Sequence, residues 1–149
     1  MDAAAALRAC PLFQGFTDTG IAILAGVCAK KTFPVGTPLF VEQMMSDSMF
    51  VIAQGRVALV VKNGPQNVPV GELGDGDWLG ELALIAPGQR QCTATAATVV
   101  EAFELRQADF QKLMNTKPQA CIKLLMSICT HFGEKVVANK DALKSLAGK

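Results

Sequence analysis

Turn-forming residues recur at short intervals through the middle of this chain, and they limit each regular element there to a few residues. They are Pro34, Gly36, Gly55, the Asn63-Gly64-Pro65 run, residues 74–77 and the Pro87-Gly88 pair. Between them lie β-prone runs at 48–53, 56–62, 68–73, 92–97 and 99–105. Short strands separated by close turns are typical of an antiparallel barrel or roll. We therefore expect residues 31–106 to form an antiparallel, jelly-roll-like β-roll in a mainly β domain.

Helix-forming residues precede the expected roll. Residues 3–6 predict a short helix, and either Thr17 or Asp18 can cap a second one, because a side-chain oxygen at the cap accepts from a free amide of the first turn. We expect that second helix to run to about Ala29. Residues 1–30 should then form N-terminal helices that flank the roll.

Helices are also expected after the roll, over residues 107–147. The sequence predicts a helix over 106–115, and Pro118 begins a last helical region that extends to about Ala147. A chain of 149 residues has the length of one domain, and a domain of this size buries about two thirds of its unfolded surface. We therefore expect a single domain over residues 1–149.

The composition argues against several classes of protein. The formal net charge is only +1, so no excess of positive charge would attract nucleic acid or an anionic membrane surface. Hydrophobic residues make up 50% of the chain, which argues against disorder. The longest apolar run, residues 21–29, is interrupted by Gly26 and is far too short to span a bilayer. The first residues lack the features of a signal peptide. We expect a cytoplasmic protein that binds neither DNA nor membrane.

Few residues here are suited to enzyme chemistry. The only histidine, His131, cannot by itself form a histidine-rich metal site, and we expect it on the surface or packed within a helix. The five cysteines contain no C-x-x-C pair, so we expect them to pack as small hydrophobic residues. They are Cys10, Cys28, Cys92, Cys121 and Cys129. We therefore expect no catalytic activity, no metal site and no cofactor.

One segment, Gly71 to Ala96, has the features of an anion-binding site. Gly80 lets the backbone approach a ligand closely, because glycine lacks a Cβ. The helix-forming run that begins at Glu81 offers unpaired N–H groups and a partial positive charge at its start. Arg90 can return to the same place and bind a phosphate with its planar guanidinium. Since Glu81 can accept from a sugar hydroxyl, the segment predicts a site for a small phosphorylated sugar.

The centre of this segment closely resembles the phosphate-binding cassette of cyclic nucleotide-binding domains. That cassette reads roughly Phe-Gly-Glu-Leu-Ala-Leu and, after a few loop residues, arginine; this chain has LGELALI at 79–85 and then Arg90. Gly36 and Gly55 also stand where the family has its early turns. The resemblance implies a stand-alone, bacterial-type domain that binds cAMP or cGMP, with its cassette at residues 79–92.

The resemblance also implies a role for each cassette residue. Glu81 would accept a hydrogen bond from the ribose 2′-hydroxyl, Arg90 would neutralise the cyclic phosphate, and the N–H groups of residues 81–83 would hold its oxygens. Gln91 stands where the family commonly has alanine, serine or threonine, so it either discriminates between bases or crowds the site. The expected ligand-binding residues are Gly80, Glu81, Leu82, Ala83, Arg90, Gln91 and Cys92.

Apolar residues in the last helical region recur at helical spacing and form one stripe. The stripe contains Leu125, Ile128, Phe132, Val136, Leu143 and Leu146, with Lys135, Lys140, Lys144 and Lys149 on the expected solvated face. The stripe can pack on the domain's own roll; in the resembling family the matching helix closes over the base as a lid or pairs with its copy in a second subunit. Phe132 and Val136 are the lid candidates. Gly133 is where we expect a bend, because glycine in a helix interior costs about 1 kcal/mol relative to alanine.

Two functions of different classes are compatible with the sequence. In the first, the domain is a non-catalytic sensor: a cyclic nucleotide binds, the C-terminal helix moves and a protein effector reads the change. In the second, a degenerate roll acts as a ligand-free protein-interaction or oligomerisation module, for example as a homodimer through the C-terminal helix. The Glu81 and Arg90 pair favours the first, whereas Gln91 favours the second. A structural ion pair between Glu81 and Arg90 is a simpler alternative for these two residues.

Overall fold

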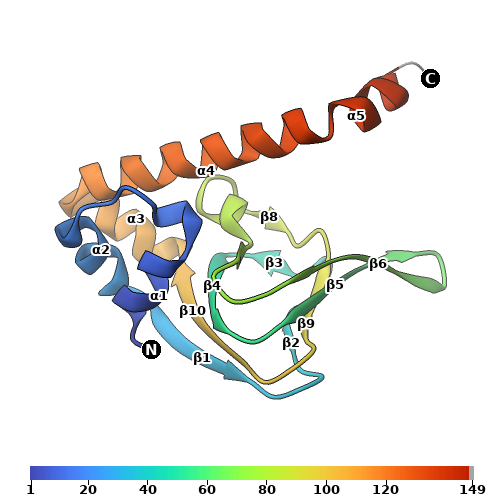
Figure 1. The fold of residues 1–149 in the computed structure, drawn as a ribbon, viewed down its shortest axis with the longest axis horizontal. Coiled ribbons are helices and arrows are strands. Elements are labelled where there is room, and N and C mark those ends of the chain that lie inside the picture. Colours follow the sequence, from blue (N-terminus) through green and yellow to red (C-terminus); the bar gives the residue numbers. More distant parts are fainter. Residues whose placement is uncertain (148–149) are drawn as a thin grey trace.

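The computed structural model describes the backbone of residues 1–147 and contains an antiparallel roll with helices at both ends of the chain (Figure 1). One four-stranded sheet has the order β1 (Ala29–Phe33), β10 (Val100–Arg106), β4 (Ser48–Gln54) and β7 (Trp78–Leu79). The other has the order β2 (Pro38–Phe40), β9 (Thr93–Ala96), β5 (Val57–Asn63) and β6 (Gln66–Leu73). A short ribbon pairs β3 (Met45–Ser46) with β8 (Gly88–Gln89). The predicted antiparallel β-roll with flanking helices is therefore confirmed.

The first of the N-terminal helices extends beyond the expected residues 3–6, whereas the second ends earlier than the sequence predicts. They are α1 (Ala3–Ala9), the 3₁₀ turn η1 (Pro11–Phe13) and α2 (Asp18–Ala25). Thr17 caps α2 as expected, since its Oγ1 accepts from the Gly20 amide at 3.0 Å. The expected end at Ala29 was wrong, because the amides of Val27 and Cys28 turn back to the carbonyls three residues earlier and close the helix. Strand β1 then begins at Ala29.

Strand β4 separates two hydrophobic cores. Successive side chains of a strand point to opposite faces, and here both faces are covered. Met49 and Val51 pack in a core formed with the helices, whereas Phe50 and Ile52 pack in the interior of the roll. Strand β4 is therefore packed on both faces and is held in place between the helices and the interior of the roll.

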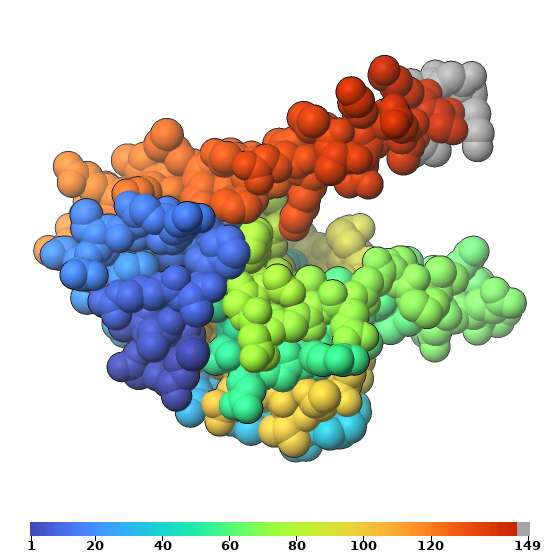
Figure 2. All heavy atoms as spheres, in the orientation of Figure 1, coloured from blue at the N-terminus to red at the C-terminus, as the bar shows by residue number. Residues whose placement is uncertain are grey.

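The C-terminal helices are α3 (Gln107–Thr116), α4 (Pro118–Ala138) and α5 (Lys140–Ala147). At Gly133, where we expected a bend, α4 runs through the exposed position without interruption. Instead, the helix ends at Asn139, whose backbone amide and side-chain amide both donate to the Lys135 carbonyl, at 3.1 and 2.7 Å. Figure 2 shows the segment of α5 projecting away from the body of the domain.

The apolar stripe of the last helix is buried only in its first half. Ile128 is buried and Leu125 is partly buried against the helical core. Phe132, Val136 and Leu143 are 50%, 41% and 46% exposed. The side chain of Leu146 and the whole of Lys149 lie outside the described residues. The stripe thus packs on its own domain at one end and presents an apolar surface at the other.

None of the helices in the described part of the chain combines the length and the hydropathy needed to cross a bilayer.

Candidate functional site

The predicted cassette residues surround one cavity of about 460 Å³, within the range of roughly 300–1,000 Å³ typical of small-molecule sites. All seven expected ligand-binding residues line it, so the structure brings together Gly80, Glu81, Leu82, Ala83, Arg90, Gln91 and Cys92. Apolar side chains of the roll, among them Phe40, Leu59 and Leu73, form the walls. Trp78 and, from α4, Lys135 also line the cavity.

Gly80 occupies a backbone position that only glycine fits. Its φ is +77°, in the left-handed region where a Cβ is disfavoured. A Cβ there would also lie 2.9 Å from the Ser48 carbonyl oxygen and would overlap the Arg90 guanidinium. The glycine therefore allows the cassette turn to pass directly over Arg90.

The segment after Gly80 forms a four-residue 3₁₀ helix, η2 (Glu81–Leu84), rather than a longer α-helix. The Ala83 amide donates to the Gly80 carbonyl at 3.1 Å to close this turn. Of the three amides that we expected to hold a phosphate, Ala83 is therefore engaged within the turn. The amides of Glu81 and Leu82 stay as candidates.

Arg90 is 5% exposed and is held from several directions. Its backbone amide donates to the Met44 carbonyl at 2.8 Å, and its guanidinium lies 4.2 Å from the centre of the Phe40 ring. Nη2 donates to Ser48 Oγ at 3.2 Å, but Nε and Nη1 find no hydrogen-bond partner among the described residues. Burial lowers the pKa of Arg90, while the carboxylates of Asp47 and Glu104 oppose that shift. Two unpaired donors on a buried cation at a cavity wall are suited to an anion.

Glu81 pairs with α4 rather than with Arg90. Its Oε1 lies 3.8 Å from Lys135 Nζ, and the same ammonium lies 5.5 Å from the centre of the Trp78 ring. Trp78 also packs in an edge-to-face arrangement with His131, at 5.1 Å between ring centres. The alternative of a Glu81–Arg90 ion pair is therefore wrong: within the described part of the chain Arg90 takes part in no salt bridge.

Lys135 is one of the site residues that the sequence did not identify. We expected it on the solvated face of the helix, and its side chain is indeed largely exposed. It also lines the cavity, which we did not expect. The available signal was its spacing from His131, because residues four apart lie on one face of a helix. Both contact Trp78. His131 itself packs on the helix as predicted, with Nδ1 2.9 Å from the Ser127 carbonyl oxygen.

The remaining predicted residues lie at the edge of the cavity or outside it. Gln91 is exposed, and its Nε2 donates to the Gln89 carbonyl at 3.0 Å, so its side chain folds back along the loop. Cys92 is half-buried, and burial raises the pKa of its thiol. Phe132 and Val136 do not belong to the cavity wall as the structure describes it. Their lid contact stays a prediction.

The other cysteines divide between the interior and the surface. Cys10 and Cys121 are buried, and Cys28 is partly buried. Cys129 is exposed on α4, so the expectation that it packs in the core was wrong. The described residues include no group of three or more histidine, cysteine or acidic side chains placed to hold a metal ion.

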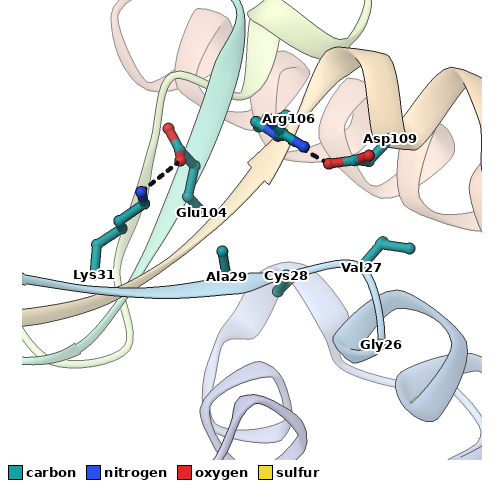
Figure 3. Close-up of a pocket in the computed structure, with 8 residues that line it drawn as sticks. All are labelled: Gly26, Val27, Cys28, Ala29, Lys31, Glu104, Arg106 and Asp109. Atoms are coloured by element: carbon teal, nitrogen blue, oxygen red, sulfur yellow. Dashed lines mark hydrogen bonds and ion pairs between the residues drawn. The ribbon is translucent and has the colours of Figure 1, made fainter.

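A second cavity, of about 510 Å³, lies beside β10 between α2 and the start of α3 (Figure 3). Its charged groups are paired with one another: Lys31 Nζ is 3.9 Å from Glu104 Oε1, and Arg106 Nε donates to Asp109 at 2.9 Å. Lining residues 26–29 complete it. Because its charges are already compensated, this cavity offers less to an ion than the cassette does.

Comparisons with known proteins agree with the cassette. The model of the cyclic nucleotide-binding domain family matches residues 30–117. A cyclic nucleotide-gated potassium channel from Mesorhizobium japonicum is 34% identical over 113 residues, and one from Rhizobium etli is 32% identical over 113 residues. Each match covers 76% of this chain but only 30% of the channel.

Solved structures extend the similarity to the whole fold. The N-terminal domain of a transcriptional regulator from Streptomyces coelicolor has a TM-score of 0.79 at 29% identity, over 87% of this chain and 94% of that one. The catabolite activator protein of Thermus thermophilus has a TM-score of 0.81 at 22% identity, over 92% of this chain and 63% of that one, and shows the fold alone. The resemblance seen in the cassette is confirmed: this chain belongs to the cyclic nucleotide-binding domain family.

Proposed function

We propose that this domain binds a cyclic nucleotide, cAMP or cGMP, in the cassette cavity and signals through a change in the position of α4. The observation that carries the proposal is Arg90, a buried cation whose Nε and Nη1 are unpaired within the described residues and which lines the cavity. A buried donor without a partner costs about 1–3 kcal/mol, and more when it is charged. A bound cyclic phosphate would remove that penalty by accepting from both nitrogens.

The rest of the cavity matches the other parts of such a ligand. The amides of Glu81 and Leu82 would hold phosphate oxygens beside Arg90, and the Glu81 carboxylate would accept from a ribose hydroxyl. The apolar walls at Leu59 and Leu73 would contact the base. Gln91 lies at the rim, where its amide can both donate and accept, so it is our candidate for base selection.

Lys135 supplies a route from the ligand to α4. In the structure Glu81 pairs with Lys135, so a ribose hydroxyl that donates to Glu81 competes with a contact made by the helix. An ion pair with one largely exposed partner contributes only about 0.2–1 kcal/mol, which makes it easy to exchange. The ligand would therefore favour one position of α4 over another, as a switch requires. Phe132 and Val136 are proposed to reach the base when α4 moves.

The exposed face of α4 favours a partner protein. On α4, the side chains of Ile122, Met126 and Val137 are each more than half exposed. We propose that a protein effector, or a second copy of this chain in a homodimer, covers this face. The same observation supports the second candidate function, a ligand-free interaction module. The first function predicts nucleotide binding and the second does not.

Isothermal titration calorimetry with cAMP and cGMP separates these functions. We expect micromolar or tighter binding that Arg90→Ala weakens by at least about tenfold, because a hydrogen bond to a charged group contributes about 1.5–3 kcal/mol. Arg56→Ala is the matched control, since Arg56 is an exposed arginine paired with Glu72 at 2.7 Å. Absence of heat with either nucleotide at millimolar concentration would refute the sensor and leave the interaction module.

A further inference from the structure

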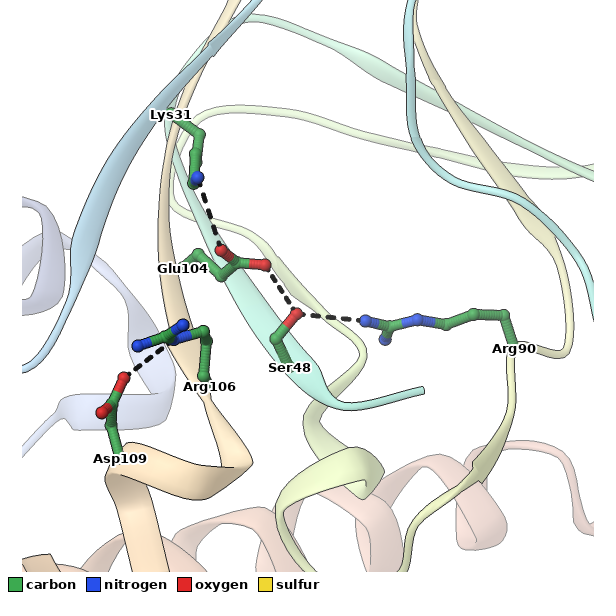
Figure 4. A network of polar contacts seen from close by, with 6 residues as sticks. All are labelled: Lys31, Ser48, Arg90, Glu104, Arg106 and Asp109. Carbon is green, nitrogen blue, oxygen red and sulfur yellow. Dashed lines mark hydrogen bonds and ion pairs between the residues drawn. The ribbon is translucent and has the colours of Figure 1, made fainter. Parts of the chain in front are cut away.

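The guanidinium of Arg90 stands at one end of a series of polar contacts (Figure 4). The series runs from strand to strand over the sheet that contains β4, β10 and β1. Its Nη2 donates to Ser48 Oγ at 3.2 Å, and Ser48 Oγ donates to Glu104 Oε2 at 2.8 Å. The other carboxylate oxygen of Glu104 lies 3.9 Å from Lys31 Nζ. The series therefore runs from the cassette cavity to the second cavity on the far side of Ser48.

The direction of every hydrogen bond in this series is fixed by chemistry. A guanidinium only donates and an ionised carboxylate only accepts, whereas a hydroxyl does both. Ser48 must therefore accept from Arg90 and direct its own hydrogen toward Glu104. Because Ser48 is 1% exposed, no competing bulk solvent is expected to reorient this hydroxyl.

The two residues behind Arg90 are fixed by paired strands. Ser48 begins β4 opposite Arg106 of β10, and Glu104 stands two residues along β10, opposite Phe50. Residues placed diagonally across an antiparallel pair lie on one face of the sheet, within reach of long side chains. The sheet thus sets the distance between Ser48 and Glu104, and neither residue depends on a loop for its position.

We infer that Ser48 and Glu104 are positioning residues for Arg90, which hold Nη2 from behind and leave Nε and Nη1 for the phosphate. This inference rests on the proposed function. Phe40 stacks on one face of the guanidinium and the turn at Gly80 passes over Nη1, so the hydrogen bond at Nη2 fixes the remaining rotation of the group.

The hydroxyl between the two charges matters for binding. A carboxylate bound directly to Arg90 would compete with the phosphate for the same nitrogens. Glu104 instead stabilises the charged guanidinium from a distance, and its carboxylate acts to raise the pKa of Arg90. Only Ser48, which donates to Glu104, occupies a guanidinium nitrogen. Lys31, on the far side, takes up the second carboxylate oxygen and leaves the first for Ser48.

Ser48→Ala and Glu104→Gln test the inference, with Glu101→Gln as the matched control. Glu101 is another glutamate of β10, and its carboxylate pairs with Lys30 at 3.7 Å. The first measurement is made on ligand-free protein: the side-chain NMR signals of ¹⁵N-labelled arginine report whether the Arg90 guanidinium rotates freely. We expect restricted rotation in the wild type and in Glu101→Gln, clearly faster rotation in Ser48→Ala, and a smaller increase in Glu104→Gln.

The second measurement is nucleotide affinity by calorimetry, after thermal unfolding has shown that each variant is folded. We expect Ser48→Ala to weaken binding about tenfold, as the loss of a hydrogen bond to a charged group does. Glu104→Gln should weaken it less, because its amide oxygen can still accept from Ser48. Glu101→Gln should leave the affinity unchanged.

Two results would overturn the inference: Arg90 signals that do not change in Ser48→Ala, or a loss of affinity in Glu101→Gln as large as in Ser48→Ala. A wild type that binds no nucleotide refutes the proposed function instead. In that case the arginine signals of the ligand-free protein still decide whether Ser48 and Glu104 hold Arg90.

Discussion

Replacing Gly80 with alanine tests the geometry on which the whole site depends. The left-handed conformation costs a residue with a Cβ about 1–2 kcal/mol, and φ is +77° at this position. The new methyl would also lie 2.9 Å from the Ser48 carbonyl oxygen, on a buried strand that cannot move easily, and would meet the Arg90 guanidinium. Overpacking of this kind costs about 1–3 kcal/mol. The two effects together predict a loss of about 2–5 kcal/mol.

Alanine substitutions at two further glycines separate the cost of the left-handed backbone from the cost of overpacking. Gly64 has a φ of +63°, but a methyl group added there would meet nothing within 4 Å, so Gly64→Ala should lose only the backbone contribution of about 1–2 kcal/mol. Gly88 has neither a positive φ nor a close neighbour, so Gly88→Ala should be nearly neutral. Chemical denaturation of the three variants gives the free energies of unfolding, and thermal unfolding should show a drop of roughly 5–15 °C for Gly80→Ala.

The ranking of the three variants is the result that decides. If Gly80→Ala is no less stable than Gly64→Ala, the close approach of the cassette turn to Ser48 and Arg90 does not exist in solution. Nucleotide binding gives an independent reading, because a methyl group that displaces the guanidinium should weaken binding even in folded protein. Unchanged affinity in Gly80→Ala would contradict the placement of Arg90 beneath this turn.

Three more outcomes follow from the site and from α4. Lys135→Ala should leave phosphate binding intact, but nucleotide should no longer change hydrogen exchange in α4, because the helix has lost its contact with Glu81. The ligand 2′-deoxy-cAMP has no 2′-hydroxyl to donate to Glu81, so it should bind the wild type without changing hydrogen exchange in α4. At pH 8 a thiol reagent should modify the exposed Cys129 quickly and the buried Cys10 slowly, because burial raises the pKa of Cys10 to about 12. The same shift predicts that the free energy of unfolding falls as the pH rises above about 9, because the Cys10 thiol then loses its proton in the unfolded chain but keeps it in the folded one. Met126→Glu should abolish a homodimer in analytical ultracentrifugation if the exposed face of α4 forms it, and a dimer that persists would exclude this face.

The parts of this fold that could be predicted are those encoded by neighbouring residues. The cassette is one continuous run from Leu79 to Cys92, and its glycine, carboxylate and arginine lie at one cavity because only η2, a short loop and β8 separate them. The strand expected at 48–53 is likewise within one residue of β4, since its apolar residues are contiguous. Strand β1 was missed because most of its residues are exposed and show no alternation.

Contacts between distant segments could not be predicted from the pattern. Ser48 and Glu104 are 56 residues apart and meet only because β4 and β10 pair in one particular register. Lys135 reaches Glu81 because α4 packs across the domain, which no local propensity encodes. In both cases the sequence supplies the chemical group and the tertiary packing supplies its partner.

These distant contacts divide the site into a fixed half and a movable half. Arg90 is held by Ser48 on a buried strand, so the phosphate end of a ligand would meet a group that the sheet keeps in place. Glu81 is held by Lys135 on a helix whose far end projects from the domain, so the ribose end would meet a group that α4 shares. Affinity would then come mainly from the first half and signalling from the second. Variants of Arg90 or Ser48 should therefore change how much nucleotide binds, whereas variants of Lys135 should change what binding does to α4.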